Sequence, residues 1–243
     1  MKSYEKLYSV ARLFLPVVYM EVRKRLLSTV GSYSYRPEIL DVGGRKSHYT
    51  IGVPAFITIS DLRRISGLQH TLHLGLNDEL MAQLRSRRSN VRQVVYDDMT
   101  GSRFPDSAFD CVVSVEVLEH VEEDQKFIEH VHRVLKPGGV FIMTTPNGDF
   151  LKVNTNPDHK RHYTRAQLIM LLQSQFHEVE VVYAVRSGKC HVAGLRSWSP
   201  RHPVGTACSM LANVINTWQS RPRLVRQSPN GTHHLIATAK KEA

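Results

Sequence analysis

The sequence has 243 residues, of which 42% are hydrophobic, so we expect one domain with a well-buried core and exclude disorder. Its 32 Lys and Arg residues against 22 Asp and Glu residues give a formal net charge of +10, which favours an anionic partner or simply a well-solvated surface. No apolar run reaches the roughly 18 residues that a membrane-spanning helix needs, and the polar N-terminus is unlike a secretion signal. Three scattered cysteines fit a reducing compartment, so we expect a cytoplasmic protein with free thiols.

The first 30 residues have an amphipathic pattern, which predicts a helical cap (residues 1–30) on a domain of residues 31–243. Apolar side chains recur at helical spacing and form one stripe, which contains Leu7, Val10, Phe14, Val17 and Val18. Because proline lacks an amide hydrogen, Pro16 is expected to kink this helix or to split it in two.

Short β-branched runs alternate with helical patterns through the rest of the chain. Strands are predicted at residues 39–43, 55–60, 91–96, 109–115, 140–145, 178–185 and 234–239. Helices are predicted at residues 79–88, 125–135, 165–176 and 203–219. Such alternation is typical of parallel βαβ units, so we predict an α/β fold whose sheet is covered by helices on both faces.

Several short motifs follow one another in the middle of the chain. They are Asp98, FPDSAFD (104–110), EVLEHV (116–121), RVLKPGG (133–139, with LKPGG as a turn) and TPN (145–147). In this order they resemble the class I S-adenosylmethionine-dependent methyltransferases, nearest to those that methylate small molecules, sugars and lipid head groups. The resemblance implies a Rossmann-like fold, a seven-stranded, mostly parallel sheet with an antiparallel last strand, and S-adenosyl-L-methionine as the methyl donor.

The loop after the first predicted strand is the expected site of the donor's methionine part. Gly43 and Gly44 allow a tight turn and a close approach of backbone N–H groups to a ligand. Asp41 could orient this loop or accept a hydrogen bond from the donor's ammonium group. The family pattern DxGxGxG has arginine here at its second glycine (Arg45) and serine at its third (Ser47). Arg45 could pair with the donor carboxylate, or it could crowd the loop and weaken donor binding.

Carboxylates also stand at the ends of the next two predicted strands. Asp61 could accept hydrogen bonds from both ribose hydroxyls, or it could cap a helix or turn. The resemblance places Asp98 at the adenine amine, with Met99 offering its backbone N–H and covering one ring face. Asp97 is interpreted as a solvated neighbour. Ser114 begins the segment that faces the transferred methyl group in this family.

Two polar clusters are the candidates for the chemistry. Glu116, Glu119 and His120 follow the fourth strand, and His159 lies in NPDHKRHYTR after the fifth. A hydroxyl acceptor benefits from a base, so Glu116, His120 and His159 are the candidate catalytic residues. All four residues also match the metal site of the small-RNA 3′-end 2′-O-methyltransferases, which would bind a divalent cation here. Alternatively, Glu119 and His120 only brace the helix that follows.

Besides His120, His159 and His162 of these clusters, the other ten histidines show no consistent ligand spacing, and we interpret them as surface or core residues without a functional role. They are His48, His70, His73, His130, His132, His177, His191, His202, His233 and His234.

The expected function is transfer of a methyl group to an oxygen, with nitrogen less favoured, of a small-molecule, glycan or lipid-linked acceptor. One alternative is metal-assisted 2′-O-methylation of RNA, although no aromatic stacking platform supports it. Another is a degenerate protein that binds the donor without turnover. The N-terminal helix could cover the acceptor as a lid, or rest on an anionic membrane through Arg23, Lys24 and Arg25.

Overall fold

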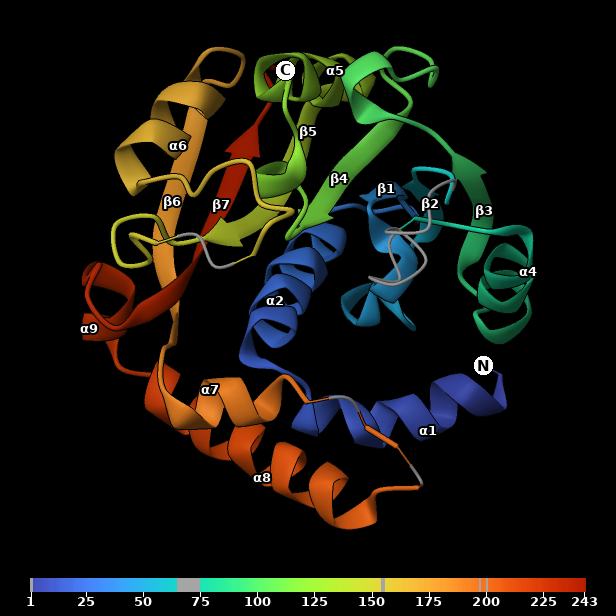
Figure 1. Ribbon diagram of the computed structural model, residues 1–243. Helices are drawn as coiled ribbons and strands as arrows, with labels where there is room; N and C mark the ends of the chain where they lie inside the picture. The colour runs from blue at the N-terminus through green and yellow to red at the C-terminus, as the bar shows by residue number, and fades with distance from the viewer. Residues whose placement is uncertain (1, 65–74, 154–155, 197, 200) are drawn as a thin grey trace.

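The computed structural model describes residues 2–64, 75–153, 156–196, 198–199 and 201–243. Seven strands of these residues form one sheet in the order β3-β2-β1-β4-β5-β7-β6 (Figure 1). They are β1 (Glu38–Val42), β2 (Phe56–Asp61), β3 (Val91–Tyr96), β4 (Phe109–Val115), β5 (Leu135–Pro146), β6 (Glu178–Arg186) and β7 (Thr232–Lys240). β7 pairs antiparallel with both β5 and β6, and the pairings among β1 to β5 are parallel. The predicted Rossmann-like sheet with an antiparallel last strand is therefore confirmed.

Helices connect the strands. They are α1 (Ser3–Ala11), α2 (Val17–Gly31), α4 (Asp78–Arg87), α5 (Asp124–Val134), α6 (Arg165–Gln173), α7 (Lys189–Gly194), α8 (Pro203–Ser220) and α9 (Arg223–Gln227). Short 3-10 turns are η1 (Arg12–Phe14), η2 (Gly44–Lys46), η3 (His48–Thr50), η4 (Met99–Gly101) and η5 (Leu118–His120). The sequence patterns did not predict α7 and α9, because one or two helical turns are too short to show a periodicity.

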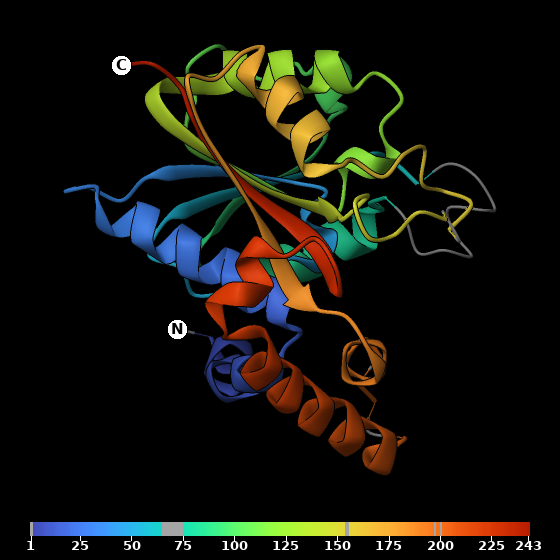
Figure 2. The same ribbon diagram turned by 90° about the vertical axis from the view of Figure 1, so that its left-hand side faces the viewer.

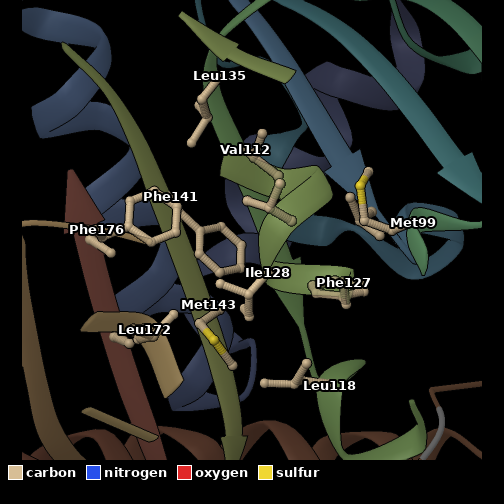
Figure 3. Packing of buried hydrophobic residues seen from close by; sticks show 14 of the residues in the cluster. Met99, Val112, Leu118, Phe127, Ile128, Leu135, Phe141, Met143, Leu172 and Phe176 are labelled. Atoms are coloured by element: carbon tan, nitrogen blue, oxygen red, sulfur yellow. The ribbon is translucent and has the colours of Figure 1, made fainter. Parts of the chain in front are cut away.

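The helices cover the sheet on both faces, as predicted. On one face, α5 and α6 pack against β4, β5 and β7, and Figure 3 shows Ile128 of α5 beside Phe141 and Met143 of β5. On the opposite face, Leu26 of α2 packs with Ile57 of β2. Successive strand residues point to opposite faces of a sheet, so the strands contribute to both cores and read as continuous apolar runs.

The N-terminal segment divides at Pro16, as predicted. α1 ends at Ala11, η1 follows, and Pro16 is the N-cap residue of α2. The predicted apolar stripe is wrong for Leu7 and Val10, which are exposed, and right for Val17 and Val18, which are buried. The first 31 residues therefore do not act as one unit, because α2 contributes to the core of the sheet.

The basic residues of α2 that were expected to face a membrane are largely engaged within the protein. Arg23 donates through Nη1 to the backbone oxygens of Tyr49 (2.9 Å) and Ile51 (2.8 Å). Arg25 pairs with Glu21 on the same helix, and Lys24 is exposed. Arg23 thus ties α2 to the η3 turn next to β1.

The LKPGG segment is not the simple turn that the sequence predicted. β5 already begins at Leu135, which pairs with Phe109, and the next pair is Cys111 with Val140. Three more residues on β5 than on β4 separate the two pairs, so the segment forms a bulge, with Gly138 at a φ of 73°.

α1, α7 and α8 gather at one end of the molecule, close to where β6 ends (Figures 1 and 2). α8 packs on α7 and contacts η1. No helix among the described residues combines the length and the apolar character that crossing a membrane would require.

We predict that Leu26→Ala lowers the free energy of unfolding by about 2–5 kcal/mol, because Leu26 is 0% exposed in the core between α2 and the sheet. The matched control is Leu27→Ala, since Leu27 is 39% exposed on the same helix turn and should change stability by only about 0.5 kcal/mol. Urea denaturation measures both. Equal losses for the two variants would mean that α2 is not part of this core.

Candidate active site

A buried polar network lies beneath the loop that follows β1. The Asp41 carboxylate is fully buried and accepts hydrogen bonds from the Tyr49 hydroxyl (2.7 Å) and the Thr50 hydroxyl (3.1 Å). The buried Arg88 guanidinium donates to the hydroxyls of Ser47 (3.0 Å) and Thr50. Burial raises the pKa of Asp41, although the hydrogen bonds to its carboxylate oppose this rise. Of the two roles open to Asp41, this geometry favours orientation of the loop.

The two glycines above this network lie where there is no room for a side chain. Gly43 has a φ of 70°, and a Cβ at this residue would lie 2.5 Å from Cγ2 of Val117. A Cβ at Gly44 would lie 2.6 Å from the carboxyl carbon of Asp41. The crossover from β1 to β2 holds only η2 and η3. The loop therefore lies directly on Asp41 and beside the segment after β4.

Arg45 lies against Asp61 at the end of β2. Its Nη1 is 3.3 Å from Oδ2 of Asp61, and the backbone N–H of Leu62 donates to the other oxygen at 2.8 Å. Burial raises the pKa of Asp61, and the nearby Arg45 opposes that rise. Arg45 thus already fills part of the hydrogen-bonding capacity that two ribose hydroxyls would use. Any ligand bound to Asp61 must share this carboxylate with Arg45 or displace the guanidinium.

The residues after β3 differ in part from the expectation. Asp98 is exposed and accepts hydrogen bonds from the backbone N–H (2.9 Å) and hydroxyl (2.8 Å) of Thr100. The Met99 side chain is buried in the core of Figure 3, so it packs inward. Asp97 is not solvated, because its side chain is only 5% exposed and its Oδ2 has no hydrogen-bond partner.

Unpartnered polar atoms collect where the parallel strands end. Besides Oδ2 of Asp97, the buried hydroxyls of Ser60 near the end of β2 and Ser114 near the end of β4 have no hydrogen-bond partner. Buried polar groups in proteins are almost always hydrogen-bonded, so such a group calls for a ligand or water. In open α/β sheets, ligands bind at this edge, so these groups fit a polar molecule bound across β1 to β4.

Glu116 is held by three contacts directly after β4. Its φ of 54° is unusual for a residue with a side chain. Its backbone N–H donates to the backbone oxygen of Thr144 (3.2 Å), and its carboxylate accepts from the Thr144 hydroxyl (2.7 Å). The same carboxylate oxygen is 3.1 Å from Nδ1 of His234. Burial alone would raise the pKa of Glu116, but His234 and Thr144 lower it below its ordinary value.

Three of the four residues predicted as metal ligands converge. The ligand atoms of Glu119, His120 and His159 lie within 4.8 Å of one another, a group that does not include Glu116. Nδ1 of His120 is 3.2 Å from the backbone oxygen of Asp158, which links η5 to the loop after β5. Burial and the Glu116 carboxylate raise the pKa of Glu119 well above its ordinary value.

His191, His233 and His234 also converge, although the sequence gave no sign of it. Their ring centroids are separated by 4.2 to 5.4 Å, and one nitrogen of each lies within 4.8 Å of the others. The interpretation of these three residues as unrelated histidines is wrong. Only the pairing of β6 with β7 brings residue 191 next to residues 233 and 234, so sequence spacing could not reveal the group. His70 and His73 lie outside the described residues.

The comparisons with known proteins agree with this architecture. A family model described as a methyltransferase domain matches residues 52–143. A probable S-adenosylmethionine-dependent methyltransferase of Mycolicibacterium smegmatis is 32% identical over 58% of this chain and 52% of its own length. A ubiquinone biosynthesis O-methyltransferase of Paramagnetospirillum magneticum is 51% identical over 18% of this chain and 17% of its own. The crystal structure of a SAM-dependent methyltransferase from Archaeoglobus fulgidus superposes with a TM-score of 0.58 at 16% identity, covering 92% of this chain and 94% of that one.

In residues 52–143 and in its fold, the chain is similar to the class I S-adenosylmethionine-dependent methyltransferase superfamily. It spans about half the length of the mycobacterial relatives that it matches. The part of those proteins beyond the match has no counterpart in the alignment, so their names alone do not fix an acceptor for this chain.

We predict that Asp61→Ala weakens binding of S-adenosylmethionine by about 1.5–3 kcal/mol, the usual contribution of hydrogen bonds to a charged group. Isothermal titration calorimetry measures the dissociation constant, and thermal unfolding checks that the variant is folded. Asp106→Ala is the control, because this aspartate is 75% exposed and lies before β4. An unchanged dissociation constant for folded Asp61→Ala would mean that the ribose binds elsewhere.

Proposed function

We propose that the protein transfers the methyl group of S-adenosylmethionine to an oxygen, with nitrogen less favoured, of a glycan or lipid-linked acceptor. The observation that carries the proposal is the line of unpartnered buried polar atoms at the carboxyl edge, next to Glu116, in a chain of this superfamily. The donor supplies an electrophilic methyl group on a sulfonium. The task of the protein is then to bind and orient two substrates and to manage one proton.

On the donor side, residues at the ends of β1, β2 and β3 have complementary tasks. Asp61 would accept the ribose hydroxyls, and Asp98 with the backbone N–H of Met99 would bind the adenine. The backbone around Gly43 would pass close to the methionine part, and Ser114 would line the site near the methyl group. Asp41 would act indirectly, because its buried hydrogen bonds hold the glycine turn. Arg45, once displaced from Asp61, would pair with the donor carboxylate.

On the acceptor side, His159 is the candidate base. Burial, together with His120 and His162, lowers the pKa of His159 to about 4, so its imidazole is neutral at neutral pH and can accept a proton. The His120 ring packs edge-on against the His159 ring, with centroids 4.7 Å apart, and would hold it in place. Glu116 would fix the neighbouring surface through Thr144 and His234. A divalent cation at Glu119, His120 and His159 is the alternative use of this cluster.

We predict that His159→Ala and His120→Ala bind S-adenosylmethionine with unchanged affinity but lose methyl transfer, because both lie beyond the donor-binding loops. The assay follows tritium from the labelled methyl group into a lipid extract of the source cells. Addition of a chelator distinguishes the two uses of the cluster, since activity would be lost only if a cation took part. Near-normal transfer by both alanine variants would contradict a catalytic role for either histidine.

A cavity between the end of β6 and the helices α8 and α9 supports an anionic acceptor. Its lining combines cationic side chains with an exposed indole, provided by Arg186, Lys189, Trp218 and Arg221 among others. Guanidinium groups bind phosphate oxygens through paired hydrogen bonds. A phosphate next to the methylated group is common to the head groups of lipid-linked glycans and matches the excess of positive charge.

The exposed face of α8 supports an acceptor that is carried in a membrane. The helix PVGTACSMLANVINTWQS contains no charged residue, and it exposes large apolar side chains such as Val204 (75%), Leu211 (61%) and Trp218 (72%). Arg201 precedes the helix and Arg221 and Arg223 follow it, and all three are exposed. An apolar face with arginines at both ends matches the interface of an anionic bilayer. This surface replaces the basic part of α2 as the membrane-facing candidate.

We predict that the protein sediments with vesicles containing anionic phospholipid and that Leu211→Glu with Trp218→Glu reduces the bound fraction at least tenfold. Loss of two large apolar contacts, each of about 1.5–3 kcal/mol, is the physical reason. Met170→Glu is the control, because Met170 is 65% exposed on α6, which lies on the opposite side of the sheet from α2. Equal sedimentation of wild type and the double variant would remove the membrane from this proposal.

A further inference from the structure

Three imidazoles meet at the junction of β6, α7 and β7. His191 lies in α7, the helix that follows β6. His233 and His234 are the second and third residues of β7. β6 and β7 are paired here, with Ala184 opposite His234 and Arg186 opposite Thr232. Figure 1 shows that α7 follows β6 and lies at the same end of the molecule as α8.

One ring nitrogen of each histidine is buried and has no hydrogen-bond partner. The atoms are Nε2 of His191, Nδ1 of His233 and Nε2 of His234. His191 and His234 are only 3% and 4% exposed, so water from the bulk does not reach these nitrogens freely. A buried unpaired imidazole nitrogen is costly, and three histidines that each have one, with a ring nitrogen of each within 4.8 Å of the others, require an explanation.

The Glu116 carboxylate sets the orientation of His234. Its oxygen is 3.1 Å from Nδ1 and, as a carboxylate oxygen, accepts a hydrogen bond there, so in the neutral imidazole Nε2 is the nitrogen left to bind a metal. Such a pair of carboxylate and histidine is the usual outer-shell arrangement around a metal-binding imidazole. Glu116 is itself fixed by the Thr144 hydroxyl at 2.7 Å.

α7 is held in place by polar contacts from α8. Oγ of Ser209 and Nδ2 of Asn213 each donate to the backbone oxygen of Gly194 at 3.0 Å. A Cβ at Gly194 would lie 2.0 Å from Oδ1 of Asn213, so the two helices touch at this point. The position of His191 is therefore determined by buried contacts and not by an exposed loop.

We propose that His191, His233 and His234 bind a divalent transition-metal ion, with zinc as the ion that three neutral imidazoles suit best. A cation would satisfy all three orphaned nitrogens at once, which no single protein donor in the described residues does. Zinc binds imidazole nitrogen at about 2.0–2.1 Å, so the three ring nitrogens, which already lie within 4.8 Å of one another, would have to move closer together to complete the site. Three protein ligands leave one coordination position for water or for an oxygen of a bound molecule.

This site is separate from the cluster of Glu119, His120 and His159 and does not depend on methyl transfer. Glu116 lies at the edge of the new site, as an outer-shell group of His234. Metal occupancy can therefore be measured in the full chain without donor or acceptor.

The test is competition of the protein with a chromophoric chelator for Zn²⁺, with any polyhistidine tag removed. We expect wild type to bind Zn²⁺ and each of His191→Ala and His233→Ala to weaken that binding at least tenfold. Glu116→Gln should weaken it by about 10–100-fold, as loss of an outer-shell carboxylate does. His202→Ala, an exposed histidine before α8, should leave it unchanged.

The variant His120→Ala distinguishes the two clusters, because it removes a ligand from the cluster of Glu119, His120 and His159 and none from the proposed zinc site. Thermal unfolding without metal shows which variants fold. If His191→Ala does not fold, His233→Ala decides the question, since His233 is less buried than His191. Absence of Zn²⁺ binding by wild type would overturn the proposal. So would binding that survives His233→Ala in folded protein but is lost in His120→Ala.

Discussion

The site depends on one buried carboxylate. Asp41 lies at 0% exposure under the first loop of the sheet, and its charge is compatible with burial only because Tyr49, Thr50 and, through them, Arg88 surround it. Tyr49 and Thr50 come from the crossover after β1 and Arg88 from the end of α4, so the network ties this crossover to a segment 38 residues further along the chain. Breaking one partner of such a group leaves an uncompensated buried charge, so the loop has little freedom to take another shape.

The rigid loop limits what the neighbouring groups can do. Gly44 has no room for a side chain above Asp41, and Arg45, the next residue, extends to Asp61. Asp61 therefore has the Arg45 guanidinium as one partner, and in the proposed function the hydroxyls of a nucleoside would be the other. At the other end of the same edge, the Glu116 carboxylate also contacts two partners, the Thr144 hydroxyl and Nδ1 of His234. In the proposed function, Asp61 would lie on the donor side and Glu116 on the acceptor side of this polar edge.

The sequence predicted the fold well because β-branched runs and helical stripes are local signals. All seven strands lie where the patterns placed them, and Pro16 divides the N-terminal helices. What failed depends on neighbours that only the folded chain provides. Nothing in the local pattern marks Arg88 as a buried residue, yet it lies in the interior with the Asp41 network. Asp97 was taken as solvated, the LKPGG bulge as a turn, and the three converging histidines as unrelated. Roles of the donor-binding residues remain predictions, since alternation places them at the right edge without showing a ligand.

The central claim is that this edge binds the methyl donor with Asp61 at its ribose. A crystal structure of the protein with S-adenosylhomocysteine tests it most directly. The account predicts that the ribose hydroxyls lie within hydrogen-bond distance of the Asp61 carboxylate and that the Arg45 guanidinium has moved from its present position 3.3 Å away. A nucleoside bound at another place, with the pair of Arg45 and Asp61 intact, would contradict the account.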